Sequence, residues 1–162
     1  MQMISERTPG SYQTLLRLEG VEKTYGSGEV AVAALKGVEL AVGRGEFVVI
    51  LGPSGSGKTT LLNLVGGIDT PTAGRILVGD EELNLYDARR LTDYRRRQVG
   101  FVFQFFNLIP TLTALENVAL VTELTGGQAD RGEAWLEMVG LGDRLHHFPQ
   151  ALSGGEQQRV AI

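Results

Sequence analysis

The spacing of apolar and polar positions along the chain predicts a β-rich first part. Apolar side chains alternate with polar ones over 15–24 and 38–42, a pattern typical of half-buried strands. The run Phe47–Leu51 is apolar at every position, which favours a strand covered on both faces, as in a parallel sheet. Short apolar runs predict two further strands, over 75–78 and 99–103. Gly79 and Asp80, which follow the first of these, are expected to form a turn rather than a metal site.

Helices are predicted between and after these strands. The expected ranges are Lys58 to about Gly66, a charged stretch over 87–97, and two further stretches over 113–124 and 129–139. Thr113 and Glu116 have the spacing of a capping box at the start of one of them. This order predicts an α/β nucleotide-binding core, in which a mixed sheet has an N-terminal antiparallel part, with an inserted helical lobe at about 105–152. The polar residues 1–13 predict a flexible lead-in, so the folded domain is expected over 14–162.

Composition narrows the class of protein. The net charge of −4 argues against a general nucleic-acid binder, and the arginines at 89, 90 and 95–97 are interpreted as the solvated face of a charged helix. The absence of cysteine excludes disulfides and thiolate metal sites. No apolar run approaches the roughly 20 residues of a membrane helix. These features predict a cytosolic protein whose membrane role, if it has one, comes through a partner.

The segment Gly52–Thr59 reads GPSGSGKT and matches the phosphate-loop pattern G-x-x-x-x-G-K-[ST] in full. It follows a predicted buried strand and precedes a predicted helix, which is the context that the pattern requires. Glycines let successive N–H groups turn toward phosphate oxygens, and the helix N-terminus adds positive potential. Lys58 is expected to reach the β- and γ-phosphates and Thr59 to ligate Mg²⁺. The sequence contains no Asn-Lys-x-Asp for reading guanine, which favours ATP.

A second candidate anion site lies about a hundred residues later, in the segment Leu152–Gln158, which reads LSGGEQQ. Ser153 and Glu156 have the spacing of another capping box, and two glycines at a helix start allow close approach of another group. On local chemistry alone, an ordinary capped helix explains the same residues.

Together these motifs resemble the ATP-binding subunits of ABC transporters. The phosphate loop, Gln104 after an apolar run, and the signature Leu152–Gln158 occur in that family's order, and Tyr25 matches its adenine-stacking aromatic. The stretches 52–67, 100–108 and 112–118 are similar to the lipoprotein-releasing and macrolide-export branch. One departure is Glu156, where many members of the family carry Gln. The capping role is kept, but a carboxylate is less favourable than an amide near phosphate.

The resemblance implies a role for each matched residue. Tyr25 stacks on adenine, although its residue type alone also fits a surface tyrosine. Gln104 reaches Mg²⁺ and the attacking water, although alone it fits a polar strand end. Ser153, Gly154 and Gly155 contact the γ-phosphate of ATP bound to a second subunit. The triphosphate is held by Gly52, Ser54, Gly55, Ser56, Gly57, Lys58, Thr59 and Thr60.

The resemblance also implies partners and a location. Two copies join head-to-tail through ATP and Mg²⁺, and integral membrane permease subunits hold them at the inner face of the cell membrane. The cluster Phe105–Pro110 fits core packing, and by resemblance it borders the groove that docks the membrane subunit. The alternatives are an ABC module in a non-transport complex such as one for cell division, a binding-only fragment and, disfavoured by the signature, a small-molecule kinase.

The family's later elements, an Asp, a Glu general base and a switch His, follow the signature, whereas this sequence ends at Ile162. We therefore expect the N-terminal portion of a longer protein, which binds ATP but hydrolyses it poorly by itself.

Overall fold

The computed structural model describes residues 2–5, 13–126 and 131–162. The chain divides into two compact units, Met1–Arg95 and Arg96–Ile162, and each is described by itself. The first unit contains the strands and the second is helical, which agrees with a β-rich first part and a helical second part.

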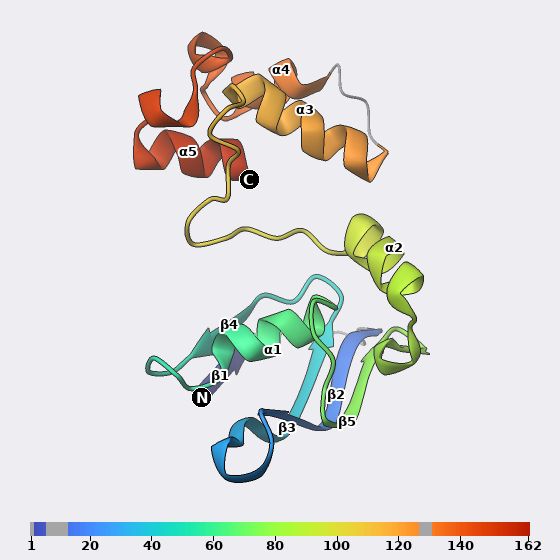
Figure 1. Ribbon diagram of the computed structural model, residues 1–162. Coiled ribbons are helices and arrows are strands. Elements are labelled where there is room, and N and C mark those ends of the chain that lie inside the picture. Colours follow the sequence, from blue (N-terminus) through green and yellow to red (C-terminus); the bar gives the residue numbers. More distant parts are fainter. Residues whose placement is uncertain (1, 6–12, 127–130) are drawn as a thin grey trace. The chain divides into compact units, whose positions relative to one another are not determined.

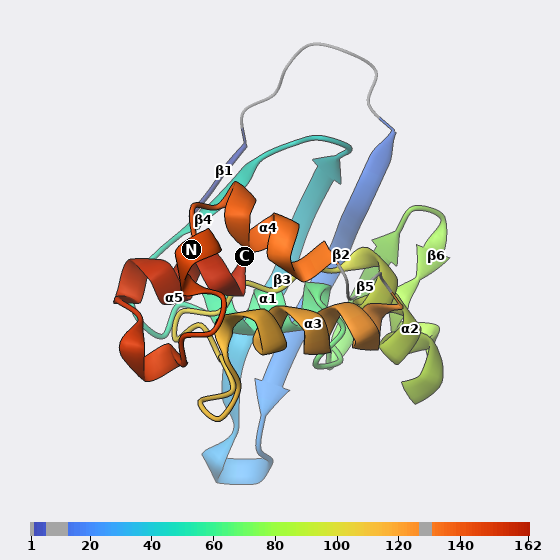
Figure 2. The same ribbon diagram turned by 90° about the horizontal axis from the view of Figure 1, so that it is seen from above.

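The main sheet of the first unit is antiparallel, with the strand order β3-β2-β5-β6 (Figures 1 and 2). The long strands β2 (Thr14–Tyr25) and β3 (Val32–Gly43) pair along their length and are joined through a 3₁₀ turn at Gly28–Val30. Both begin or end beyond the ranges predicted from alternation. The third strand, β5 (Ala73–Val78), turns at residues 79–80 into the short β6 (Glu81–Glu82), as the Gly-Asp pair predicts.

A second, two-stranded sheet corrects two expectations. The strand β4 (Val48–Leu51) pairs antiparallel with β1 (Gln2–Ser5), so part of the expected flexible lead-in is a strand. The side chains of β4 are half-buried or exposed rather than covered on both faces. Among the described residues every strand pair is antiparallel. An apolar run indicates burial, but it does not specify the direction of the partner strand.

The helix α1 (Lys58–Val65) and most of α2 (Ala88–Gln98) complete the first unit. Leu61 and Leu64 of α1 are fully buried. Leu18, Val21 and Ile76 of the main sheet are fully buried as well. The hydroxyl of Tyr94, on α2, donates to the backbone oxygen of Val65 at 2.8 Å and so ties α2 to the end of α1. The buried apolar residues of this unit include Leu18, Val21, Leu35, Leu61, Leu64, Ile76, Leu83 and Tyr94.

The second unit is built from α3 (Ala114–Thr125), α4 (Gly132–Met138) and α5 (Gly154–Ala161), with 3₁₀ turns at Gly142–Arg144 and Pro149–Ala151. All three helices are predicted from the sequence, although residues 129 and 130 of the helix expected over 129–139 lie outside the described residues. The core contains Ala114, Leu136, Leu141, Leu152 and Val160.

The buried amide of Asn117 joins the preceding loop to α3. Its Oδ1 accepts from the N–H of Ile109 at 2.7 Å, and its Nδ2 donates to backbone oxygens that include Leu112 and Thr113. Because both ends of this buried amide are hydrogen-bonded, the loop has a defined course up to the helix.

The predicted strand over 99–103 is wrong. These residues are not paired with any strand among the described residues, although the rings of Phe101 and Phe103 stack with centroids 5.6 Å apart. A strand requires a neighbour for its backbone groups, and local hydrophobicity does not supply one.

Candidate functional site

The phosphate loop connects β4 to α1 in the position that the motif predicts. Gly57 is the N-cap of α1 and has a left-handed backbone, with φ +88°. A Cβ atom at this position would lie 2.6 Å from the carbonyl oxygen of Ala34 and 2.8 Å from the side chain of Leu35. Glycine is therefore required both by the backbone conformation and by the close approach of β3.

The side chain of Lys58 lies over this loop. Its Nζ donates to the backbone oxygens of Gly52 and Pro53, at 2.8 Å each, and lies 3.5 Å from Oγ of Ser56. The loop is thus curled around an ammonium group whose present acceptors are oxygen atoms. Phosphate oxygens are acceptors of the same kind with more negative charge, so the residues present fit a bound polyphosphate.

The first turn of α1 offers further donors. The first hydrogen bond from α1 back to its N-cap is the one from the N–H of Leu61 to the oxygen of Gly57, at 2.9 Å. The N–H groups of Lys58, Thr59 and Thr60 precede it and have no acceptor within the helix. Thr59 is exposed on this turn, so its hydroxyl is available as a metal ligand. No group of three or more His, Asp or Glu side chains among the described residues is arranged to hold a metal ion.

Tyr25 ends β2 and is 41% exposed. Its hydroxyl donates to Oδ2 of Asp69 at 2.9 Å, and Lys23 binds the other carboxylate oxygen at 2.6 Å. The Lys23 ammonium also donates to the oxygen of Thr70 and lies 4.9 Å from the centre of the Tyr25 ring. Partial burial raises the pKa of Asp69, but the hydrogen bonds from Lys23, Tyr25 and the N–H of Thr70 outweigh it and hold the pKa below its ordinary value.

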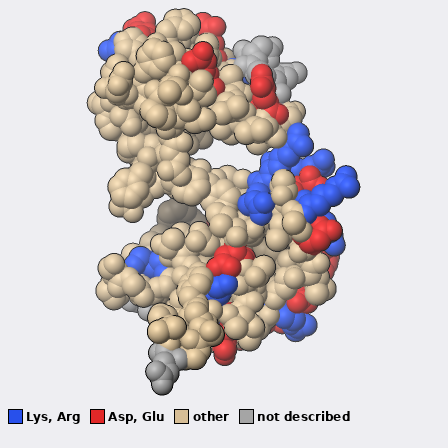
Figure 3. All heavy atoms as spheres, viewed as in Figure 1, with Lys and Arg blue, Asp and Glu red and all other residues tan. Residues whose placement is uncertain are grey.

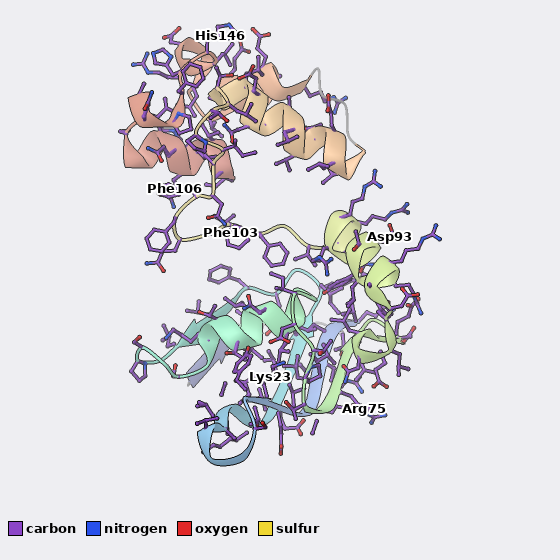
Figure 4. The ribbon with its side chains drawn as sticks, viewed as in Figure 1. Lys23, Arg75, Asp93, Phe103, Phe106 and His146 are labelled. Atoms are coloured by element: carbon purple, nitrogen blue, oxygen red, sulfur yellow. The ribbon has the colours of Figure 1, made fainter. Side chains whose placement is uncertain are left out.

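Gln104 belongs to the second unit, in the segment between α2 and α3. It is exposed and lies within a turn that the N–H of Phe106 closes on the oxygen of Phe103, at 3.2 Å. Phe106 and Asn107 then take positive φ values of 60° and 53°, which are uncommon for residues other than glycine. Figure 4 shows Phe103 and Phe106 on this segment. The predicted position at the end of a strand is therefore replaced by a turn.

The signature forms the start of α5. Ser153 is the N-cap: its Oγ accepts from the N–H of Glu156 at 3.3 Å, and its own N–H donates to the Glu156 carboxylate at 2.7 Å. The predicted capping box is confirmed. The Ser153 hydroxyl also donates to the Glu156 carboxylate, so it has to change partner in order to donate to an anion. The glycines at 154 and 155 occupy the first turn, where backbone N–H groups have no acceptor within the helix.

The negative charge of Glu156 is compensated locally. Nε of Arg144 lies 3.2 Å from its second carboxylate oxygen. Hydrogen bonds from the backbone and side chain of Ser153, and then from Arg144, hold the pKa of Glu156 below its usual range despite an opposing effect of desolvation. A carboxylate neutralised in this way is less repulsive to phosphate than the sequence alone indicates.

The structure groups the site residues by unit. Tyr25 and the phosphate loop lie in the first unit, and Gln104 and the signature lie in the second. Sequence reasoning missed Lys23 and Asp69 around Tyr25, and Arg144 beside Glu156. Lys23 is two residues from Tyr25 on one strand and so shares a face with it, a signal that could have been used. Asp69 carries no such local signal.

With this geometry in place, the comparisons with known proteins decide the family. Residues 35–162 match the family model described as ABC transporter. The chain belongs to the ABC transporter family. The resemblance drawn from the phosphate loop and the signature is therefore confirmed.

Within the ABC transporter family the chain is similar to several curated proteins. It is 53% identical to an ABC transporter ATP-binding protein of Thermotoga maritima, over 91% of this chain and 65% of that protein. It is 46% identical to the lipoprotein-releasing system ATP-binding protein LolD of Shewanella frigidimarina, over 93% of this chain and 64% of that protein. It is 50% identical to the macrolide export ATP-binding/permease protein MacB of Brucella melitensis, over 91% of this chain and 24% of that protein.

Among solved structures of ABC proteins, the chain resembles the ATP-binding cassette MJ0796, described as a dimer in a post-hydrolysis state bound to ADP and phosphate. The TM-score is 0.82 at 46% identity, over 91% of this chain and 67% of that one. This likeness confirms the predicted α/β P-loop NTPase fold. The chain thus spans about two thirds of the length of this cassette and of the ATP-binding proteins above.

Proposed function

We propose that this chain is the ATP-binding part of a transporter, and that it couples ATP binding and hydrolysis to transport or extraction by membrane partners. The observation that carries the proposal is the phosphate loop, in which a left-handed Gly57 starts a helix and Lys58 is held by loop carbonyl oxygens. Membership of the ABC transporter family and the similarity to LolD and MacB support the transport role.

In this proposal the first unit binds Mg²⁺-ATP. Adenine stacks on the exposed ring of Tyr25, a contact worth about 1–3 kcal/mol per base where it has been measured in other proteins. Lys58 transfers its hydrogen bonds from loop carbonyl oxygens to the β- and γ-phosphates, and Thr59 ligates Mg²⁺. The remaining phosphate contacts are assigned to Gly52, Ser54, Gly55, Ser56, Gly57 and Thr60.

Two parts of the second unit are proposed to contact ATP and its Mg²⁺ ion. Gln104 contacts Mg²⁺ and the attacking water. Ser153, Gly154 and Gly155 donate to the γ-phosphate of ATP bound to a second copy, so that ATP joins two copies head-to-tail. The free donors at the start of α5 and the dimeric form described for the cassette MJ0796 support this assignment.

We assign the membrane partner to an apolar pocket of the second unit. The pocket holds about 380 Å³ and is lined mainly by apolar side chains, Phe106, Leu108 and Trp135 among them. The names of the relatives LolD and MacB support an integral membrane partner. No described helix is both long and apolar enough to span a bilayer. The proposed location, the cytoplasmic face of the membrane, is reached through this partner.

The test of nucleotide binding is the substitution Lys58→Ala, with affinity for Mg²⁺-ATP measured by calorimetry. A charge-assisted hydrogen bond contributes about 1.5–3 kcal/mol, so we expect affinity to fall by at least tenfold. Lys36→Ala removes the same charge from an exposed position on β3 and should leave binding unchanged. Equal affinity of the Lys58→Ala variant and the unaltered chain would refute the phosphate-loop assignment.

A further inference from the structure

Two charged side chains from separate segments meet at the ring of Tyr25. Asp69, in the loop after α1, accepts the Tyr25 hydroxyl at 2.9 Å and the Lys23 ammonium at 2.6 Å. The side chain of Lys23 is only 12% exposed, although lysine is usually a solvated residue. The phosphate-loop motif does not include either residue, and Lys23 and Asp69 lie 46 positions apart.

We propose that Asp69 and Lys23 are positioning residues, which hold the Tyr25 ring in the orientation that receives the adenine of ATP. This inference rests on the proposed stacking of adenine on Tyr25 and goes beyond it. The hydrogen bond to Asp69 fixes the rotation of a ring that is otherwise 41% exposed. Ordering the ring before binding removes an entropic cost that adenine otherwise imposes.

The position of Lys23 also selects a face of the ring. Its ammonium lies over the ring, 4.9 Å from the centroid, in a cation–π arrangement. That face is occupied, so adenine stacks on the opposite face. The Lys23–Asp69 pair is neutral as a unit, so it does not attract the phosphates directly. The pair therefore affects ATP binding only through the adenine base. A ligand with the phosphates but without the base should be unaffected by it.

The test compares Mg²⁺-ATP with Mg²⁺-tripolyphosphate, which has the phosphates without the base, by calorimetry on the full chain. Tyr25→Phe keeps the ring and removes the hydroxyl, while Asp69→Ala removes the acceptor. Both variants should lose about two- to tenfold in ATP affinity, which is the range for ordering one side chain, and keep their tripolyphosphate affinity. Asp69→Asn keeps an acceptor oxygen and should recover part of the loss.

Tyr25→Ala separates this inference from the proposed function. If Tyr25→Ala leaves ATP affinity unchanged, adenine stacking itself is wrong. If Tyr25→Ala weakens ATP binding but Tyr25→Phe and Asp69→Ala do not, stacking stands and the positioning role is overturned. Equal losses for ATP and tripolyphosphate would assign Asp69 a merely structural role and also overturn it.

A double variant tests whether Asp69 affects ATP binding independently of the Tyr25 ring. Once the ring is gone, Asp69 has nothing to position, so Asp69→Ala combined with Tyr25→Ala should bind ATP as Tyr25→Ala alone does. A further loss in the double variant would show that Asp69 acts independently of the ring and would overturn the inference. Because Tyr25→Phe deletes a single oxygen, it decides the question even if Asp69→Ala fails to fold.

Discussion

Gly55 and Gly57 occupy the same loop with similar backbone conformations and different surroundings. Both have positive φ, at +77° and +88°. A Cβ atom at Gly55 would meet nothing within 4 Å, whereas at Gly57 it would collide with Ala34 and Leu35 of β3. The pair therefore separates the conformational effect of a side chain from its steric effect.

Alanine substitutions at these two glycines should have unequal effects on stability. Gly55→Ala introduces only the left-handed backbone penalty, about 1–2 kcal/mol in the free energy of unfolding. Gly57→Ala adds the displacement of β3 or of the loop and should lower that free energy by clearly more. Equilibrium unfolding in urea measures both. Indistinguishable midpoints would contradict the close approach of Gly57 to β3.

The residues of the proposed nucleotide site differ in how far sequence predicts them. Lys58 is a candidate from sequence because its proposed role depends on eight consecutive residues that specify loop, helix start and charge together. Asp69 is not predicted, because its contact with Tyr25 exists only after the loop behind α1 folds back onto β2. Residues that meet from distant segments form no local sequence motif, so their contact is not predicted from spacing along the chain.

The same distinction holds for whole elements. The helices α3 and α5 have their N-caps at Thr113 and Ser153, as the capping boxes predict, because a cap is decided within four residues. The strand expected over 99–103 and the parallel neighbours expected for β4 are absent among the described residues, because a strand depends on a partner that local sequence does not name.

The carboxylate of the α5 cap predicts a dependence of stability on pH. Hydrogen bonds from Ser153 and Arg144 hold the pKa of Glu156 below its value in the unfolded chain. The contribution of this carboxylate to the free energy of unfolding is therefore complete at pH values above the unfolded-state pKa. The contribution is lost as pH falls through the lowered pKa of the folded state. Glu156→Gln keeps an acceptor for the cap and does not titrate, so its unfolding free energy should fall less between about pH 6 and about pH 3.

Glu123→Gln is the matched control for this measurement, since Glu123 is exposed on α3 outside its first turn. It should retain the acid dependence of the unaltered chain. If Glu156→Gln and Glu123→Gln give parallel curves, the cap of α5 is not the source of the dependence.

At the scale of the whole molecule, each unit has its own buried apolar residues. A segment without helix or strand, residues 99–113, lies between α2 and α3 and carries Gln104. Arginines gather on the surface of α2, which precedes this segment, as Figure 3 shows. Arg89, Arg90, Arg96 and Arg97 are exposed, as the sequence interpretation of a solvated face predicts, whereas Arg95 is half-buried and donates to the backbone oxygen of Gly67 at 2.6 Å.

Limited digestion with chymotrypsin should cut this segment first. Phe105 is 82% exposed and lies in irregular chain, where a protease can extend the backbone. We expect early fragments of about residues 1–105 and 106–162, measured by mass spectrometry. Phe47 is an internal control, since it is 73% exposed but adjoins β4. Initial cleavage at Phe47 would contradict the two-unit description.

The ammonium of Lys58 has a consequence for how any affinity measured at this loop is interpreted. It already donates to the oxygens of Gly52 and Pro53, so arrival of a polyphosphate is an exchange of partners rather than the gain of a new one. The free energy lost in Lys58→Ala is then the difference between two sets of hydrogen bonds and understates the contact with phosphate. When the polyphosphate leaves, the ammonium can return to the same two carbonyl oxygens.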